Sequence, residues 1–267
     1  MIKTMFEGII VGRYIYSDTI FHRLDARTKI ILTLLLAAMI FSAKKFGIIY
    51  MLLVCIIYVL VSRVGLRAII KSIRPILFLA AITLIFNTRL TEGQAIFSFW
   101  IFRPTYEGLQ IGATGALRLI LLVMSASAMT FTTKPLELTD AIERLLKPLS
   151  IFKVPTKDIA MTMGIAINFI PIIGEEAQKI IEAQKSRGAD FDGKGIFNKA
   201  KAALPLIVPL IAAAIRRSEA LADAMDSRCY GLGERTQLKD SKLKTNDIIA
   251  LLLAFIAVAG LLGVSRL

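Results

Sequence analysis

The chain has 267 residues, of which 56% are hydrophobic, and its 33 Lys+Arg outnumber its 20 Asp+Glu to give a formal net charge of +13. Soluble domains are about half apolar and about a quarter charged, so a charged share of only 20% favours a membrane protein over a nucleic-acid-binding protein. The apolar content excludes disorder, and two cysteines exclude a disulfide scaffold. The single histidine, His22, excludes a multi-histidine metal site within this chain. We expect no metal, no cofactor and no nucleic-acid partner.

Five stretches of the chain are apolar and free of charged residues, at 30–43, 46–62, 75–88, 119–133 and 248–265. A helix needs about 20 mainly apolar residues, with a range of about 17–25, to cross a bilayer. The second and fifth stretches are long enough, and the other three reach that length if flanking Lys and Arg side chains extend to the headgroups. We expect an all-α, multi-pass bundle of about five spans, in which Arg118 lies near a membrane face or is paired inside the bundle.

Charge in the loops predicts the orientation of these spans. The first 27 residues carry charges of both signs and no apolar core, so we expect no cleavable signal peptide. The loop after the second span has no acidic residue and four basic ones, Arg63, Arg67, Lys71 and Arg74, whereas the loop after the third is balanced. Basic loops tend to face the cytoplasm, which places the N-terminus there too. Lys44 and Lys45 then lie outside, against the rule.

The segment at 134–247 differs from the rest, with 18 Lys+Arg against 15 Asp+Glu, whereas residues 1–133 have 14 against 5. Mixed charge with helical periodicity indicates amphipathic helices, which we place at 136–147, 156–186 and 198–227, with Asn198 as an N-cap. The two long helices contain prolines in their apolar halves, so we expect them to lie at the membrane surface or half-submerged in it, and additional spans are the alternative. We divide the chain into spans 1–4 with their lead-in (1–134), a cytoplasmic coupling domain (135–240) and a last span (241–267).

The two long helices end in one pattern, namely acid, Ala, two variable residues, Ser, Arg and a small residue. It reads EAQKSRG at 182–188 and DAMDSRC at 223–229. An arginine at a helix C-terminus favours the helix dipole and can simply cap carbonyl groups. Two matching arginines, Arg187 and Arg228, instead favour docking into two similar acidic grooves, because the guanidinium donates to carboxylates and carbonyls together.

With these motifs the sequence resembles the transmembrane component of energy-coupling factor (ECF) transporters, the EcfT/CbiQ family. That family carries two short Ala-Arg-Gly-type motifs at the ends of cytoplasmic coupling helices, which correspond here to Ser186-Arg187-Gly188 and Ser227-Arg228-Cys229. Its lead-in to the first span is also similar, through Ser17, His22, Leu24, Asp25, Arg27 and Lys29. Ala26 replaces the usual proline, both triplets begin with Ser where Ala is common, and Cys229 replaces glycine.

The resemblance implies a non-enzymatic coupling subunit of an ATP-driven importer in the plasma membrane. Two ATP-binding cassette ATPase subunits would each receive one triplet, and a substrate-binding membrane subunit, the S component, would bind the coupling helices and carry a vitamin or transition metal. One alternative is a permease that binds substrate itself, although few polar residues lie in the spans beyond Arg118, Asn168 and the Ser/Thr near 125–133. A membrane-integral lipid-modifying enzyme is another alternative, for which Asp223 and Asp226 are too few acidic groups.

Overall fold

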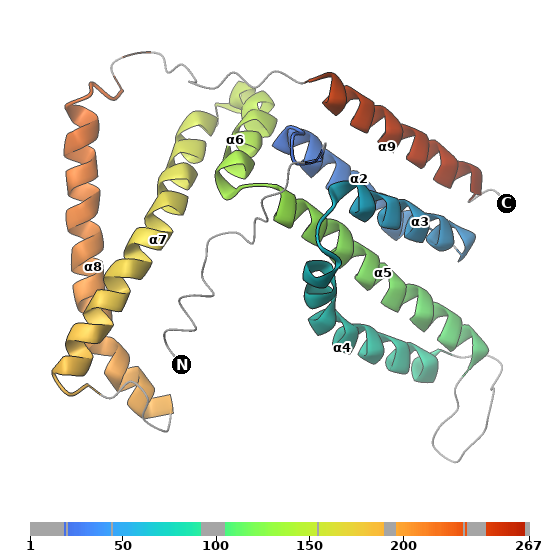
Figure 1. Ribbon diagram of the computed structural model, residues 1–267, viewed down its shortest axis with the longest axis horizontal. Coiled ribbons are helices and arrows are strands. Elements are labelled where there is room, and N and C mark those ends of the chain that lie inside the picture. Colours follow the sequence, from blue (N-terminus) through green and yellow to red (C-terminus); the bar gives the residue numbers. More distant parts are fainter. Residues whose placement is uncertain are drawn as a thin grey trace. The chain divides into compact units, whose positions relative to one another are not determined.

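The computed structural model describes residues 19, 21–43, 45–91, 105–153, 155–189, 196–231, 233 and 244–264. All regular secondary structure in these residues is helical, with eight α-helices and one 3-10 helix (Figure 1). The predicted all-α fold is therefore confirmed. Ser17 of the lead-in lies outside the described residues. The helices form two compact units, one with α2–α6 and α9 and the other with α7 and α8.

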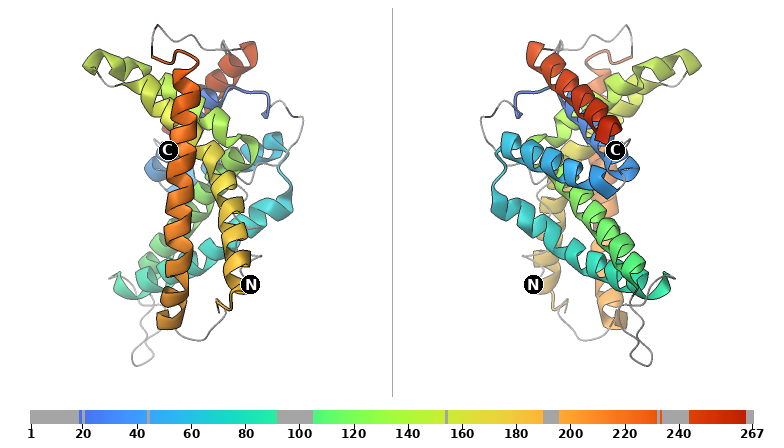
Figure 2. Two further views of the ribbon diagram at one scale, coloured as in Figure 1. Left: turned by 90° about the vertical axis from the view of Figure 1, so that its left-hand side faces the viewer. Right: turned by 90° about the vertical axis from the view of Figure 1, so that its right-hand side faces the viewer.

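The first unit is organised around α5 (Tyr106–Thr132), which packs against α2 (Ala26–Ser42), α3 (Lys45–Ser62) and α4 (Leu66–Leu90). Helix α9 (Thr245–Val264), far along the chain, packs against α2 and α3, as Figure 2 shows in its right-hand view. Helix α6 (Pro135–Leu146) contacts α2 and continues into the 3-10 helix η1 (Lys147–Phe152). Pro135 occupies the first helical position of α6, where no backbone N–H is needed.

Two buried clusters hold this unit together. The larger one joins α2, α3, α5 and α9 through Leu36, Met39, Ile40, Met51, Cys55, Leu121 and Leu261. The smaller one packs the start of α4 onto the last turns of α5 through Val59, Val64, Ile69, Ala128 and Phe131. Arg118 is half-buried and donates from Nη2 to the carbonyl of Ala43, the C-cap of α2, at 2.6 Å, so this side chain has a hydrogen-bond partner on a neighbouring helix end.

Several helices have the length and composition of a membrane span. Helices α4, α5 and α7 (Thr156–Ser186) are long and apolar enough to cross a bilayer, and residues Gly47–Ser62 and Thr245–Leu261 form shorter apolar helices. Helix α2, the predicted first span, has 17 residues. That α7 lies at the membrane surface remains a prediction. The alternative is that α7 is an additional span, and α7 is long enough for this.

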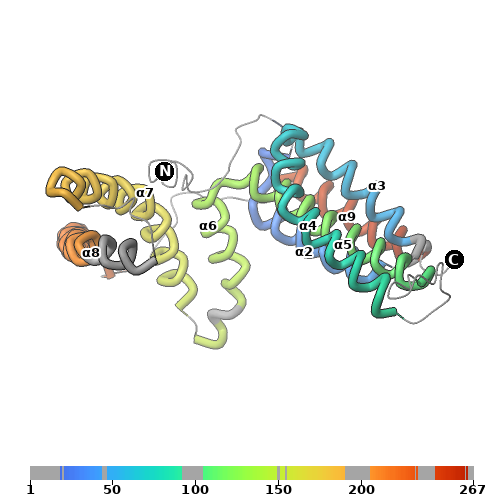
Figure 3. The backbone as a smooth tube through the Cα atoms, turned by 90° about the horizontal axis from the view of Figure 1, so that it is seen from below, coloured from blue at the N-terminus to red at the C-terminus, as the bar shows by residue number. Residues whose placement is uncertain are grey.

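The second unit consists of α7 and α8 (Ile196–Asp226), each of 31 residues. The predicted bounds of α7 match the observed ones. Helix α8 extends two residues further back than predicted, so Asn198 lies in its first turn and the expected N-cap was wrong. The two helices run in opposite directions (Figure 2), Figure 3 views α8 nearly end-on with α7 beside it, and the hydroxyl of Tyr230, after α8, donates to Met161 Sδ near the start of α7 at 2.9 Å.

Glycines allow α4 and α5 to approach closely, and we predict that Gly108→Ala lowers the stability of the protein. A Cβ atom at Gly108 would lie 2.6 Å from the carbonyl oxygen of Asn87 and 2.9 Å from Thr88 Cα, so the helices must separate. Overpacking of this kind costs about 1–3 kcal/mol. The measurement is thermal unfolding of the purified protein in detergent.

Gly115→Ala is the matched control on the same helix. Its Cβ would meet only the Cγ2 atom of Thr83, at 3.4 Å, and alanine favours a helix over glycine by about 1 kcal/mol. We expect an unchanged or raised melting temperature for this variant. Equal destabilisation by both variants would contradict the close approach at Gly108.

Candidate functional site

The two predicted docking motifs form the same backbone structure at the ends of α7 and α8. After α7, Gly188 N–H donates to the Lys185 carbonyl and Ala189 N–H to the Gln184 carbonyl, both at 3.0 Å. After α8, the equivalent bonds run from Cys229 to Asp226 at 2.9 Å and from Tyr230 to Met225 at 3.0 Å. This pair of bonds defines the Schellman C-cap. The sequence repeat is therefore also a repeat in three dimensions.

The third residue of each motif turns the chain away from the helix. Gly188 has φ +85° and Cys229 has φ +57°, so both adopt the left-handed conformation that a Schellman cap requires. The cysteine that departs from the family pattern therefore keeps the backbone geometry of a glycine. It does so at a cost, because a residue with a Cβ atom is disfavoured there by about 1–2 kcal/mol.

The arginines occupy the C-cap position of both helices, directly before the left-handed residue. Arg187 and Arg228 are exposed, and neither forms an ion pair within the described part of the chain. Arg187 N–H donates to the Gln184 carbonyl and Arg228 N–H to the Met225 carbonyl, both at 3.1 Å. Their backbones are thus held by the cap while both guanidinium groups remain available to a partner.

The two motifs lie at opposite ends of the α7–α8 pair. The Tyr230–Met161 hydrogen bond places the end of α8 beside the start of α7, whereas Arg187 follows the other end of α7. A helix of 31 residues is about 46 Å long at 1.5 Å per residue. The two arginines therefore lie at separate places on this unit.

The lead-in motif instead forms a buried polar cluster in the first unit, centred on Lys29. The Lys29 side chain is fully buried, and its Nζ donates to the carbonyl of Thr132 at 2.8 Å and to that of His22 at 3.3 Å. Thr132 is the last residue of α5, where carbonyl groups carry the negative end of the helix dipole. Lys29 therefore ties the first turn of α2 to the last turn of α5.

Asp25 and Asp247 connect the N-termini of α2 and α9 in this cluster. Asp25 is the N-cap of α2, with its Oδ1 accepting from Arg27 N–H at 2.9 Å. The backbone N–H of Asp25 donates to Asp247 Oδ1, and Lys244 N–H donates to Asp247 Oδ2, both at 2.8 Å. One buried carboxylate thus binds a backbone donor at the start of each helix, a position that the dipoles also favour.

The other lead-in residues have structural contacts as well. His22 Nδ1 and Thr19 Oγ1 are joined by a hydrogen bond of 2.6 Å, Leu24 is buried, and Arg27 Nε lies 3.6 Å from Asp25 Oδ1. Sequence reasoning missed Asp247, whose partner Asp25 is 222 positions away. A local signal was available, because an acidic residue in the first turn of an apolar helix is a capping pattern. The lead-in residues and the arginine motifs belong to different units.

The third motif position is glycine after α7 and cysteine after α8, and we predict that substitutions at these two positions change the stability of the two caps in opposite directions. Gly188→Ala should weaken the cap of α7 by about 1 kcal/mol, and Cys229→Gly should strengthen that of α8 by up to about 1 kcal/mol, because only glycine adopts this φ without strain. The readout is hydrogen exchange of the last-turn amides, which should change about fivefold in opposite directions. Changes of equal sign would contradict equivalent caps.

The polar cluster leads to a second prediction. Asp247→Ala should lower the free energy of unfolding by about 3 kcal/mol, since two backbone N–H groups lose a charged acceptor and Lys29 loses a nearby negative charge. Thermal unfolding in detergent measures the change. Asn246→Ala, at the exposed neighbouring position, is the control and should change stability by less than about 0.5 kcal/mol. Similar losses in both variants would show that Asp247 is not a structural anchor.

Comparison with known proteins shows the family of the chain. The family model described as cobalt transport protein, CbiQ, matches residues 17–238. The chain is 42% identical over 258 residues to the energy-coupling factor transporter transmembrane protein EcfT of Clostridium kluyveri, covering 95% of this chain and 96% of that protein. It is 40% identical over 247 residues to the protein of the same name from Ruminiclostridium cellulolyticum, covering 92% of each. Since the family model covers most of the chain and both relatives are at least 40% identical over more than 90% of it, the chain belongs to the EcfT/CbiQ family of transmembrane components of energy-coupling factor transporters.

Proposed function

We propose that this chain is the coupling subunit of an ATP-driven importer, and that Arg187 and Arg228 each dock one cytoplasmic ATP-binding cassette ATPase. The observation that carries the proposal is the pair of matching Schellman caps at opposite ends of α7 and α8, each presenting an exposed arginine. A guanidinium beside helix-end carbonyls can fill an acidic groove and donate several hydrogen bonds at once. In this scheme Ser186, Gly188, Ser227 and Cys229 complete the docking surfaces.

The same arrangement gives a route for mechanical coupling. Each ATPase holds one end of the helix pair, so a change in the distance between the ATPases on ATP binding moves the two ends relative to each other. Helices α7 and α8 can carry that displacement along their length, and their internal prolines, Pro171, Pro205 and Pro209, are the points where they can bend. The chain itself needs no catalytic residue for this role, since the ATPases supply the chemical step.

An apolar row on α8 is suited to a membrane partner. Ile207, Ile211 and Ile215 recur at every fourth residue and are 49%, 54% and 52% exposed. An exposed row of this kind usually marks a surface that another protein or lipid covers. We propose that a substrate-binding S component covers it and that this subunit selects the vitamin or transition metal. The coupling domain at 135–240 and a cytoplasmic N-terminus are parts of the same proposal.

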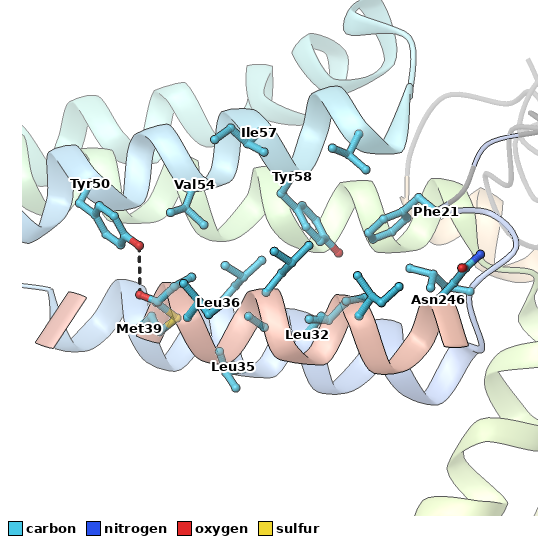
Figure 4. A pocket seen from close by; sticks show the side chains of 18 residues that line it. Phe21, Leu32, Leu35, Leu36, Met39, Tyr50, Val54, Ile57, Tyr58 and Asn246 are labelled. Carbon is cyan, nitrogen blue, oxygen red and sulfur yellow. Dashed lines mark hydrogen bonds between the residues drawn. The ribbon is translucent and has the colours of Figure 1, made fainter. Parts of the chain in front are cut away.

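The alternative of a permease that binds substrate itself is not favoured by the cavity in the first unit. A cavity of about 540 Å³ lies between α2, α3 and α9 (Figure 4). Its lining is apolar except for Tyr50, Tyr58 and Asn246, and Tyr50 donates its hydroxyl proton to the carbonyl of Ala257 at 3.2 Å. A charged or strongly polar substrate would lack partners there. Asp223 and Asp226 do not favour an enzyme either, because both are exposed on α8.

Substitution of the two arginines tests the docking proposal. We expect Arg187→Ala and Arg228→Ala each to weaken co-purification with the ATPase subunits by about tenfold or more, the size of an interface hot spot, and the double variant to abolish ATP-driven uptake. Arg187→Lys and Arg228→Lys should restore only part of the affinity, because lysine lacks the planar fork of donors.

Arg216→Ala is the matched control, since Arg216 is exposed on α8 before the cap. It should leave both the complex and uptake unchanged. Retention of a full complex and of full uptake by the double variant would refute docking through the arginines.

A further inference from the structure

We propose that the start of α4 binds the phosphate groups of anionic phospholipids. The site consists of Arg63, in the turn before α4, and Arg67, Lys71 and Arg74 within the helix, which we call the basic stripe. At about 100° per residue, the three helical members fall within an arc of about 60°. All four side chains are exposed, and none forms an ion pair within the described residues.

The helices that carry and flank the basic stripe in sequence have no acidic residue. The sequence has none between Asp25 and Glu92, so α2, α3 and α4 contribute no carboxylate to this surface. The stripe therefore presents four positive charges that are not ion-paired within the described residues. Lysine and arginine side chains bind phosphate through charge-assisted hydrogen bonds, and clustered phosphates of a lipid surface can satisfy several cations together.

An apolar row beside the basic stripe favours a lipid over a soluble acidic protein. The row consists of Leu66, Ile70 and Leu77, which are at least half exposed. Viewed along the axis of α4, these residues lie about 60–100° around the helix from Arg67. On the far side, buried Ile69 packs against the last turns of α5. A helix with one basic face, one exposed apolar face and one packed face fits the boundary between headgroups and acyl chains.

The position of the basic stripe along α4 agrees with this boundary. Pro75 follows the last basic residue, and the helix changes direction within its length in Figure 1, as expected where a proline interrupts the backbone hydrogen bonds. Residues 75–88 beyond it carry no charge. The first part of α4 can thus lie at the surface while the second part enters the bilayer. This inference does not depend on which subunits the chain assembles with.

The test uses the full-length protein in detergent, titrated with phosphatidylglycerol or phosphatidylcholine and followed by native mass spectrometry. We expect the wild type to prefer phosphatidylglycerol by about tenfold, and the variant with all four residues changed to Gln to bind the two lipids within about twofold, because each cation near a lipid surface adds a similar attraction. A variant with Arg63, Arg67 and Arg74 changed to Lys keeps the charge and should keep the preference.

A second set of changes controls for net charge and folding. Lys157, Lys179, Arg216 and Arg217 are equally exposed on α7 and α8, and their replacement by Gln should leave the lipid preference intact. If the fourfold stripe variant melts earlier than wild type, Arg67→Gln/Lys71→Gln takes its place, with a partial loss expected. The proposal is overturned if the stripe variants keep the preference, if the control variant loses it equally, or if inorganic phosphate or an acidic peptide displaces the lipid.

Discussion

The packing of the first unit depends on how the positive charge of the fully buried Lys29 is compensated. A buried ammonium group is tolerated only if hydrogen-bond acceptors and opposite charges surround it. Lys29 obtains two backbone carbonyls, and the carboxylates of Asp25, Glu137 and Asp247 attract it. These groups come from the lead-in and from α5, α6 and α9, so none of those elements can withdraw without leaving the charge uncompensated. The need to compensate the charge of Lys29 thus determines where the lead-in, α5, α6 and α9 meet.

This cluster also joins the end of α5 to the start of α9. Thr132, which accepts from Lys29, ends α5 just before α6, and Lys244, which donates to Asp247, directly precedes α9. Helix α6 belongs to the same unit and contacts α2, so the chain leaves this unit only after η1. The lead-in motif is polar although it is buried, because its groups bind backbone groups at helix ends far along the chain.

Local sequence patterns predicted the helices better than their contacts. The bounds of α7 followed from Pro155 before it and Gly188 after it, and the repeated Ser-Arg-small pattern predicted two equivalent helix ends, because capping depends on residues within one turn. The start of α8 was misplaced at Asn198, since a good capping residue can also lie inside a first turn. The Asp25–Asp247 bond and the packing of α9 on α2 and α3 join residues about two hundred positions apart, which no local pattern encodes.

The two arginine ends share a backbone but are held differently, and this difference follows from their third and fourth residues. Gly188 adopts its positive φ without strain, and Ala189 after it has only a methyl side chain. Cys229 adopts the same conformation with a Cβ penalty, and Tyr230 after it forms a hydrogen bond with α7 that offsets part of this penalty. The Tyr230 hydroxyl thus links the end of α8 to its neighbouring helix, and Ala189 at the equivalent position after α7 has no side-chain group that could form such a bond.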